Sequence, residues 1–248
     1  MKKFLVASFC LLILTSCSSS PAANHQNRKI AEAVYQEGKA YFSQERYSIA
    51  LGKFIEAEKI IKDDRFLQYD LGYTYFLKKK YNLSELHFKK ALEIEPDFTP
   101  ALNALGVVFL EQKQWDKSII SFNKCLDSLI YPTPHYALAN LGWAYFGKRN
   151  YTLANQNFLK ALEKSPNYSQ ALHGFATVSL EINQGSIALG RLERALRKAP
   201  KSWIIHYDLA KIYDKSGQFH KAKQYWEKVI ELAPEGSKFL SEAEKRLM

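Results

Sequence analysis

The sequence predicts an all-α protein, a right-handed superhelix of six helical hairpins that ends in a capping helix. Gly38, Gly72 and Gly106 stand 34 residues apart. Later prolines keep the same spacing: Pro166, Pro200 and Pro234. A fixed period of this length indicates helix–turn–helix units that stack into a quasi-one-dimensional array. Arrays of this kind bind other chains along a concave face, so we expect a scaffold and not a catalyst.

The six repeats are predicted to begin at residues 31, 65, 99, 135, 169 and 203 and to cover 31–235. Each places small residues where its two helices cross and large ones between neighbouring hairpins. Prolines after the second helices end them, because proline lacks an N–H and has a fixed φ. Two extra residues enter near Tyr131-Pro132-Thr133-Pro134. Period and pattern together are those of the tetratricopeptide repeat.

A short amphipathic helix is predicted over residues 236–248, after the last repeat. Ser241 and Glu244 have the spacing of a capping box. We expect this helix to cover the exposed end of the sixth repeat with the apolar residues of one face: Phe239, Leu240, Ala243 and Leu247.

Residues 1–16 read as a lipoprotein signal peptide. Their apolar stretch covers 11 residues, whereas a membrane-spanning helix takes roughly 20. It ends in Leu14-Thr15-Ser16-Cys17, which resembles a bacterial lipobox. In such signals the cysteine is acylated and the leader is removed before it. The alternative is an ordinary leader with a chance cysteine at this place.

Cys17 is therefore the predicted lipidation site, and its acyl chains are the predicted contact with the membrane. Two or three chains anchor a protein stably, where one is marginal. Ser18 after the cysteine favours sorting to the outer membrane of a Gram-negative bacterium, facing the periplasm. Residues 17–30 are expected to be the lipidated cysteine and a flexible tether, because residues 18–28 are polar.

The formal charge of the chain is +10. Its lysines read either as solvated outer helix faces or as contacts to anionic lipid or cell-wall polymer. Export argues against a nucleic-acid partner. Of three cysteines only Cys125 remains after the leader and the lipidated residue, and it is expected to be a buried small apolar residue.

Enzyme motifs are absent: the sequence has no HExxH, GxSxG, phosphate-binding loop or paired CxxC. His173 and His206 stand in neighbouring repeats, but a metal site needs further ligands. We therefore expect no catalytic residues, no metal and no cofactor.

The predicted partner-binding groove consists of positions 2, 5, 9 and 12 of each first helix. Aromatic residues at such positions form an apolar groove for an extended or helical peptide, unless they pack against the next repeat. Repeats five and six have more polar groove residues, among them His173, Thr177, Tyr207, Lys211 and Asp214. The candidate binding residues of repeats one to four are Tyr35, Phe42, Tyr69, Tyr73, Phe76, Asn103, Leu110, Asn140, Trp143 and Phe146.

The junction between the third and fourth repeats is more specific than the general repeat pattern. The segments 103–106, 109–113 and 140–142, with Tyr131-Pro132 between them, resemble the corresponding stretch of the PilF/PilW/Tgl lipoproteins. These are acylated type IV pilus pilotins with six repeats. The resemblance implies a scaffold that carries secretin subunits to the outer membrane or supports their assembly, with contact through the first repeats. Because Cys125 stands alone, a disulfide known in some members cannot form here.

Two other functions remain open. The chain is alternatively a general periplasmic adaptor that docks proteases or cell-wall hydrolases. The second alternative is a lipoprotein subunit of the outer-membrane assembly machine. Neither alternative is an enzyme.

Overall fold

A computed structural model of the protein describes residues 21–128 and 130–248, with side chains from residue 25 onward. The described residues form helices and turns and contain no strand. They fall into two compact units, one up to residue 62 and one from 63 to 248. The predicted leader and Cys17 lie outside the described residues. This all-α arrangement confirms the predicted fold class.

The first unit is one hairpin of α1 (Pro21–Ser43) and α2 (Tyr47–Glu58). The helix α1 begins ten residues before the predicted first repeat. The prediction of a flexible tether is therefore wrong for residues 21–30. Those residues suit a helix, because a proline fits its first turn, no glycine follows before Gly38, and Arg28 pairs with Glu32 one turn on.

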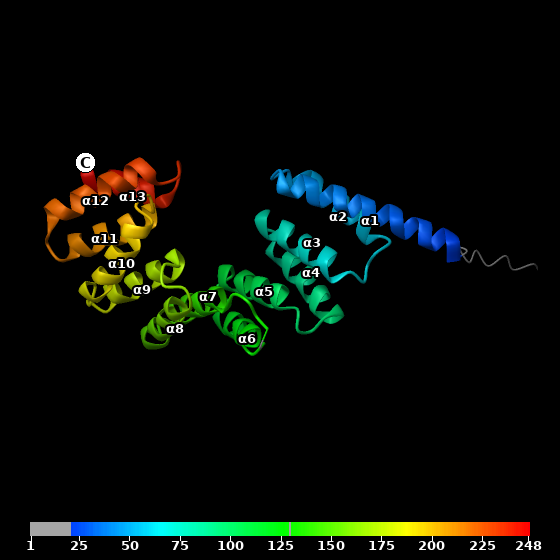
Figure 1. The fold of residues 1–248 in the computed structure, drawn as a ribbon, viewed down its shortest axis with the longest axis horizontal. Coiled ribbons are helices and arrows are strands. Elements are labelled where there is room, and N and C mark those ends of the chain that lie inside the picture. The colour runs from blue at the N-terminus through cyan, green and yellow to red at the C-terminus, as the bar shows by residue number, and fades with distance from the viewer. Residues whose placement is uncertain (1–20, 129) are drawn as a thin grey trace, which may run out of the picture. The chain divides into compact units, whose positions relative to one another are not determined.

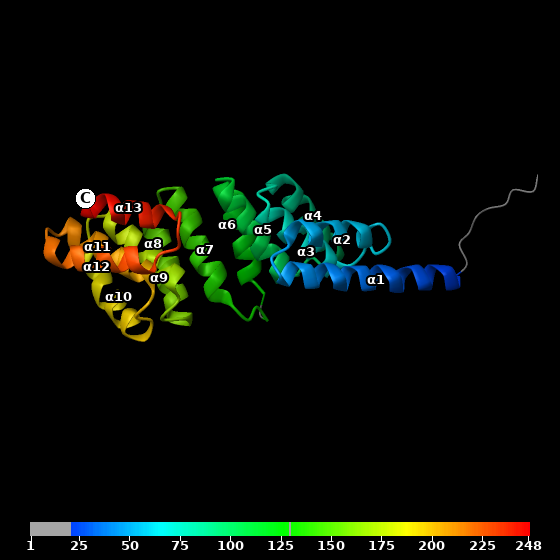
Figure 2. The ribbon, with the colours of Figure 1, turned by 90° about the horizontal axis from the view of Figure 1, so that it is seen from above.

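The second unit contains five further hairpins and a final helix (Figure 1). Each hairpin packs on the next, and both views show successive hairpins side by side up to the C-terminal end (Figure 2). No helix among the described residues has the length and apolar character needed to cross a membrane. The helices of this unit are α3 (Arg65–Leu77), α4 (Tyr81–Ile94), α5 (Thr99–Glu111), α6 (Trp115–Leu126), α7 (Pro134–Gly147), α8 (Tyr151–Lys164), α9 (Ser169–Glu181), α10 (Ser186–Lys198), α11 (Trp203–Lys215), α12 (Phe219–Leu232) and α13 (Lys238–Leu247).

The helix crossings rest on a small residue that faces a large one sixteen positions later. A Cβ atom added to Gly106 would lie 2.5 Å from Cε1 of the fully buried Phe122. Gly72 has the same relation to Phe88, at 2.7 Å. At these two crossings the aromatic ring occupies the space of a side chain, so any residue larger than glycine would require the ring to shift. Equivalent pairs are Gly38 with Phe54, Gly142 with Phe158, Ala176 with Leu192 and Ala210 with Trp226.

The turn inside every hairpin has a residue in the left-handed region at the fifteenth position of the repeat. In the sixth repeat this residue is Gly217, with φ of 74°. The other five repeats use residues with side chains, which bear a modest strain there. They are Glu45, Lys79, Lys113, Arg149 and Asn183, with φ between 56° and 59°.

The segment between α6 and α7 contains the two inserted residues. Tyr131 packs with Phe122 and Cys125 in a cluster that fills the junction. Cys125 is fully buried, as predicted, and burial raises the pKa of its thiol to about 11. This thiol is therefore a packed side chain and not a nucleophile.

The helix α13 packs against α12 at the C-terminal end (Figure 1), and its Glu242 reaches Tyr207 and Lys211 of the first helix α11. Its cap is Ser237, whose hydroxyl accepts a hydrogen bond of 3.2 Å from the Leu240 N–H. The predicted capping box at Ser241 and Glu244 is therefore wrong by one helical turn. The serine that ends the Gly236 turn has the extended backbone that a cap requires, whereas Ser241 lies inside the helix.

Candidate functional site

In the second unit, the first helix of each repeat lies against the first helix of the next. Contacts join α3 to α5, α5 to α7, α7 to α9 and α9 to α11. Close approach on this side places the first helices on the inner face of the row of repeats. The predicted groove positions of repeats two to six stand on these helices.

In the first unit, the predicted groove residue Tyr35 is buried, with 6% of its surface exposed. Its ring centroid lies 5.7 Å from that of Phe54 in the facing helix. Phe42 is half-buried between Tyr47 and Phe54. The prediction that Tyr35 is an exposed groove residue is therefore wrong, because its ring completes the core of its own hairpin.

On α3, three predicted residues form a ladder of nearly parallel rings. Tyr69 stacks on Tyr73 at 6.2 Å, and Tyr73 stacks on Phe76 at 6.3 Å. Tyr73 is the most open of the three, with 37% of its surface exposed. Tyr69 also packs on Phe88 and Phe98, and this burial raises its pKa to about 12. The ladder is thus exposed at Tyr73 and packed against core residues at Tyr69.

On α5 and α7, Asn140 donates a hydrogen bond to the side-chain oxygen of Asn103 at 3.5 Å. Both amides are half-buried. Leu110, near the C-terminal end of α5, is half-buried as well. The two asparagines bridge neighbouring repeats. At this distance the bond is weak, so both amides keep hydrogen-bonding capacity for a peptide backbone.

Trp143 and Phe146 on α7 are half-buried and pack edge-to-face at 5.6 Å. Trp143 also packs on Phe158 at 5.2 Å and lies 5.5 Å from the ring of His173. One edge of the indole therefore belongs to the core and another faces the fifth repeat. Here the structure joins the predicted aromatic groove to the polar positions of the last two repeats.

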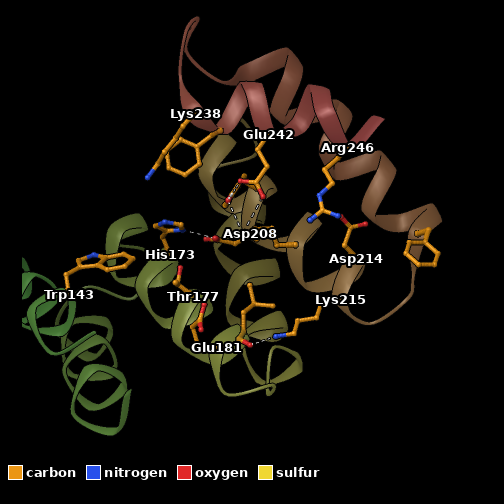
Figure 3. Close-up of a pocket in the computed structure, with 15 residues that line it drawn as sticks. Trp143, His173, Thr177, Glu181, Asp208, Asp214, Lys215, Lys238, Glu242 and Arg246 are labelled. Carbon is orange, nitrogen blue, oxygen red and sulfur yellow. Dashed lines mark hydrogen bonds and ion pairs between the residues drawn. The ribbon is translucent and has the colours of Figure 1, made fainter. Parts of the chain in front are cut away.

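Beyond Trp143 lies a cavity of about 620 Å³ (Figure 3). Its walls come from α9, α11 and α13, with Trp143 at one end, and Phe219 is also part of the lining. Its lining includes the predicted groove residues of repeats five and six: His173, Thr177, Tyr207, Lys211 and Asp214. The sequence reasoning placed these residues in the groove but missed the wall that α13 supplies. The signal for it was the apolar face of the predicted C-terminal helix, which required a surface to cover.

A hydrogen bond between a histidine and a buried aspartate forms the base of this cavity. The His173 Nδ1–H donates to Asp208 Oδ1 at 2.7 Å. Asp208 is almost fully buried, and burial raises its pKa to about 6 although His173 acts in the opposite direction. Because Nδ1 is held by the carboxylate, the other ring nitrogen of His173 is the one available to the cavity.

A second polar network joins α11 to α13. The Tyr207 hydroxyl donates to Glu242 Oε2 at 2.7 Å, and Lys211 donates to the same hydroxyl at 3.2 Å. Lys211 also pairs with Glu242 Oε1 at 3.4 Å. Burial and the neighbouring carboxylate raise the pKa of Tyr207 above its usual range, so the hydroxyl remains a donor.

His173 and His206, the two histidines considered as metal ligands, do not form a shared site. His206 bonds the Pro200 carbonyl through Nε2 at 2.8 Å and lies beside Tyr225, whereas His173 turns to Asp208. Within the described part of the chain, no group of three or more His, Cys, Asp or Glu residues has metal-binding geometry.

Family comparisons agree with the helix pattern. Tetratricopeptide-repeat models match residues 67–98, 135–168 and 203–235. The matched segments are therefore tetratricopeptide repeats, and the described hairpins between them have the same helix–turn–helix form. Such repeats generally serve as protein-interaction scaffolds and bind protein partners. A search of curated protein sequences finds no significant match.

Several solved structures share the fold over most of the chain. PilW, described as a widely conserved type IV pilus biogenesis factor, is 20% identical, with a TM-score of 0.75 over 86% of this chain and 97% of PilW. PilF of Pseudomonas aeruginosa is 17% identical, with a TM-score of 0.71 over 90% of this chain and 98% of PilF. A repeat protein from Parabacteroides merdae is 13% identical, with a TM-score of 0.68 over 92% of this chain and 85% of its own. At these identities the likeness concerns the fold.

Proposed function

We propose that this protein is a lipid-anchored periplasmic scaffold that promotes the localisation and assembly of an outer-membrane secretin in type IV pilus biogenesis. The observation that carries the proposal is the match to PilW, a type IV pilus biogenesis factor, along nearly the full length of both chains.

The anchor in this proposal is Cys17, through the lipobox that precedes it. Only residues 18–20 separate this cysteine from α1, so the helix would begin close to the membrane surface. Attachment confines the scaffold and its partner to one surface. A tether of this kind raises the effective concentration of the partner to the order of millimolar.

The partner in this proposal is a segment of the secretin subunit, bound on the first helices. The exposed edge of the α3 ladder, with Tyr73 at its centre, supplies an apolar surface for a helical or extended segment. Trp143 and the two bridging asparagines lie farther along the same inner face. These groups combine apolar contact with hydrogen bonds to a peptide backbone.

The test measures SDS-resistant secretin multimers in a deletion strain and its complemented derivatives. We expect loss of multimers and surface pili while secretin monomer still accumulates. Wild type should restore multimers, whereas Cys17→Ala should not. Tyr73→Ala with Phe76→Ala should restore them poorly. The matched control is Ile120→Ala, which removes an apolar side chain of 56% exposure from a second helix.

Normal multimers in the deletion strain would contradict the secretin role. That result would favour a general periplasmic adaptor, or a subunit of the outer-membrane assembly machine. The proteins recovered with the scaffold from detergent-solubilised envelopes would then distinguish these two alternatives. Proteases or cell-wall hydrolases would indicate the adaptor, and components of the assembly machine would indicate its subunit.

A further inference from the structure

The cavity between α9, α11 and α13 is lined by four cationic side chains, Lys211, Lys215, Lys238 and Arg246. It is also lined by four carboxylates: Glu181, Asp208, Asp214 and Glu242. The formal charges therefore balance. Which ligand fits depends on which of these groups still has unused hydrogen-bonding capacity.

Arg246 has almost all of its capacity unused. Its closest carboxylate oxygen is Asp214 Oδ2 at 3.9 Å, which is too long for a hydrogen bond. That oxygen already accepts the indole N–H of Trp226 at 2.8 Å. The guanidinium descends from α13 into the upper part of the cavity (Figure 3). The side chain is 55% exposed, so its five N–H donors are open to solvent and to a ligand.

Lys238 is the second donor on this wall. Its ammonium lies 5.0 Å from the centroid of the Phe239 ring and makes no hydrogen bond to any residue in 25–128 or 130–248. Figure 3 shows it on the same side of the cavity as Arg246, with Glu242 between them. The α13 wall therefore presents two cations that the described side chains do not satisfy.

Several carboxylate oxygens of the cavity, in contrast, already have hydrogen-bonding partners. Glu242 accepts from Tyr207 at one oxygen and pairs with Lys211 at the other. Asp208 accepts from His173 at one oxygen, and its second oxygen is buried and has no hydrogen-bond partner among the described residues. Glu181 lies on the opposite wall beside Lys215 (Figure 3). On α13 itself, a ligand therefore meets the cations of Lys238 and Arg246 and one carboxylate, Glu242, whose two oxygens already have partners.

We propose that this cavity binds an acidic peptide segment, with its Asp or Glu side chains on Lys238 and Arg246. Arginine and lysine form their strongest hydrogen bonds with carboxylates, and the arginine fork accepts one in bidentate geometry. Trp143, Tyr207 and Phe239 provide apolar surface for the neighbouring side chains of the segment. The overall charge of +10 favours approach of an acidic chain.

A peptide fits this cavity better than a small anion because the lining extends from Trp143 on α7 across the first helices α9 and α11 to α13. A chain can therefore enter from the α7 side and extend along the inner face. This site differs from the aromatic surface of the second repeat, so it does not depend on the proposed secretin role.

The test uses the full-length protein in a non-ionic detergent and fluorescent capped peptides in which Asp alternates with Leu. Fluorescence anisotropy should show binding that weakens with added salt. A peptide with Asn in place of Asp should bind at least roughly tenfold more weakly. Arg246→Gln and Lys238→Gln should each lower the affinity for the Asp peptide by a similar factor, roughly tenfold.

The matched control is Lys245→Gln, which removes a cation from the same last turn of α13 at a position outside the cavity. It should leave the affinity unchanged. Far-UV circular dichroism checks that the variants keep α13. Lys238 lies in the first turn of α13, where loss of a cation does not weaken the helix.

Equal affinity for the Asp and Asn peptides would overturn the proposal, as would equal losses in all three variants. Tighter binding of a Lys peptide would instead assign the cavity to basic chains through Glu181. Binding of the Asn peptide only when its C-terminus is uncapped would assign it to a chain terminus. Both results would overturn recognition of acidic side chains.

Discussion

A methyl group added at a helix crossing should cost stability only where an aromatic ring fills the space. In Gly106→Ala the new Cβ would lie 2.5 Å from the Phe122 ring, where nonbonded carbons prefer about 3.5–4.0 Å. The ring must move by about 1 Å, and it is fully buried. Overpacking of this kind costs about 1–3 kcal/mol.

The substitution also improves helix propensity by about 1 kcal/mol, so the net loss at Gly106 is about 0–2 kcal/mol. Gly190 on α10 provides the matched control, because a Cβ there meets nothing within 4 Å. Gly190→Ala should therefore stabilise the protein by about 1 kcal/mol. The two variants should differ by about 1–3 kcal/mol in the free energy of unfolding.

Urea unfolding followed by circular dichroism and tryptophan fluorescence measures this difference. The double variant with Phe122→Leu copies the Ala176 and Leu192 pair of the fifth repeat. It should show a favourable coupling of about 0.5–3 kcal/mol between the two sites. Equal shifts for Gly106→Ala and Gly190→Ala, or purely additive effects in the double variant, would refute the ring-against-glycine packing.

Three further predictions follow from burial and charge. Phe88→Ala should lower the free energy of unfolding by about 3–5 kcal/mol in the same urea assay, whereas Tyr73→Ala should cost much less; equal losses would place Tyr73 in the core. Burial raises the pKa of Asp208 to about 6 from 3.8, so the folded state holds this proton more tightly. The free energy of unfolding should therefore fall by up to about 3 kcal/mol between pH 4 and 6, and Asp208→Asn should remove that fall. An unchanged pH dependence in Asp208→Asn would contradict this assignment. Cys17→Ala should release the protein from the outer-membrane fraction, and unchanged fractionation excludes the lipid anchor.

The sequence predicts the hairpins well because their information is local and repeated. Gly72 and Phe88 belong to one hairpin, and the same pair recurs at Gly106 and Phe122. A crossing of two adjacent helices needs only this alternation of small and large residues. For the same reason Cys125, which occupies a small-residue position, could be predicted as buried.

The backbone of the turns was not predictable in the same way. Lys79, Lys113 and Arg149 adopt positive φ without being glycine. Nothing in these residue types signals that conformation. It is imposed by the two packed helices that each turn must join, whose burial outweighs a modest local strain.

Groove residues were predicted only as positions on a helix face. Tyr35 and Tyr73 both stand on first helices, yet one is buried on Phe54 and the other is exposed at the edge of a ladder. Exposure depends on which rings of the second helix and of the next repeat reach that position. This is a property of packing between segments and not of the repeat pattern.

By itself the sequence determined the repeat, its phase and the positions of the first helices, because a 34-residue period records contacts within each hairpin. Only the tertiary structure decided that α13 closes a cavity over α9 and α11. The wall combines His173, Asp208 and Glu242, which lie about one repeat apart along the chain. Such contacts join successive repeats, so their geometry follows from stacking, which the pattern of a single repeat does not encode.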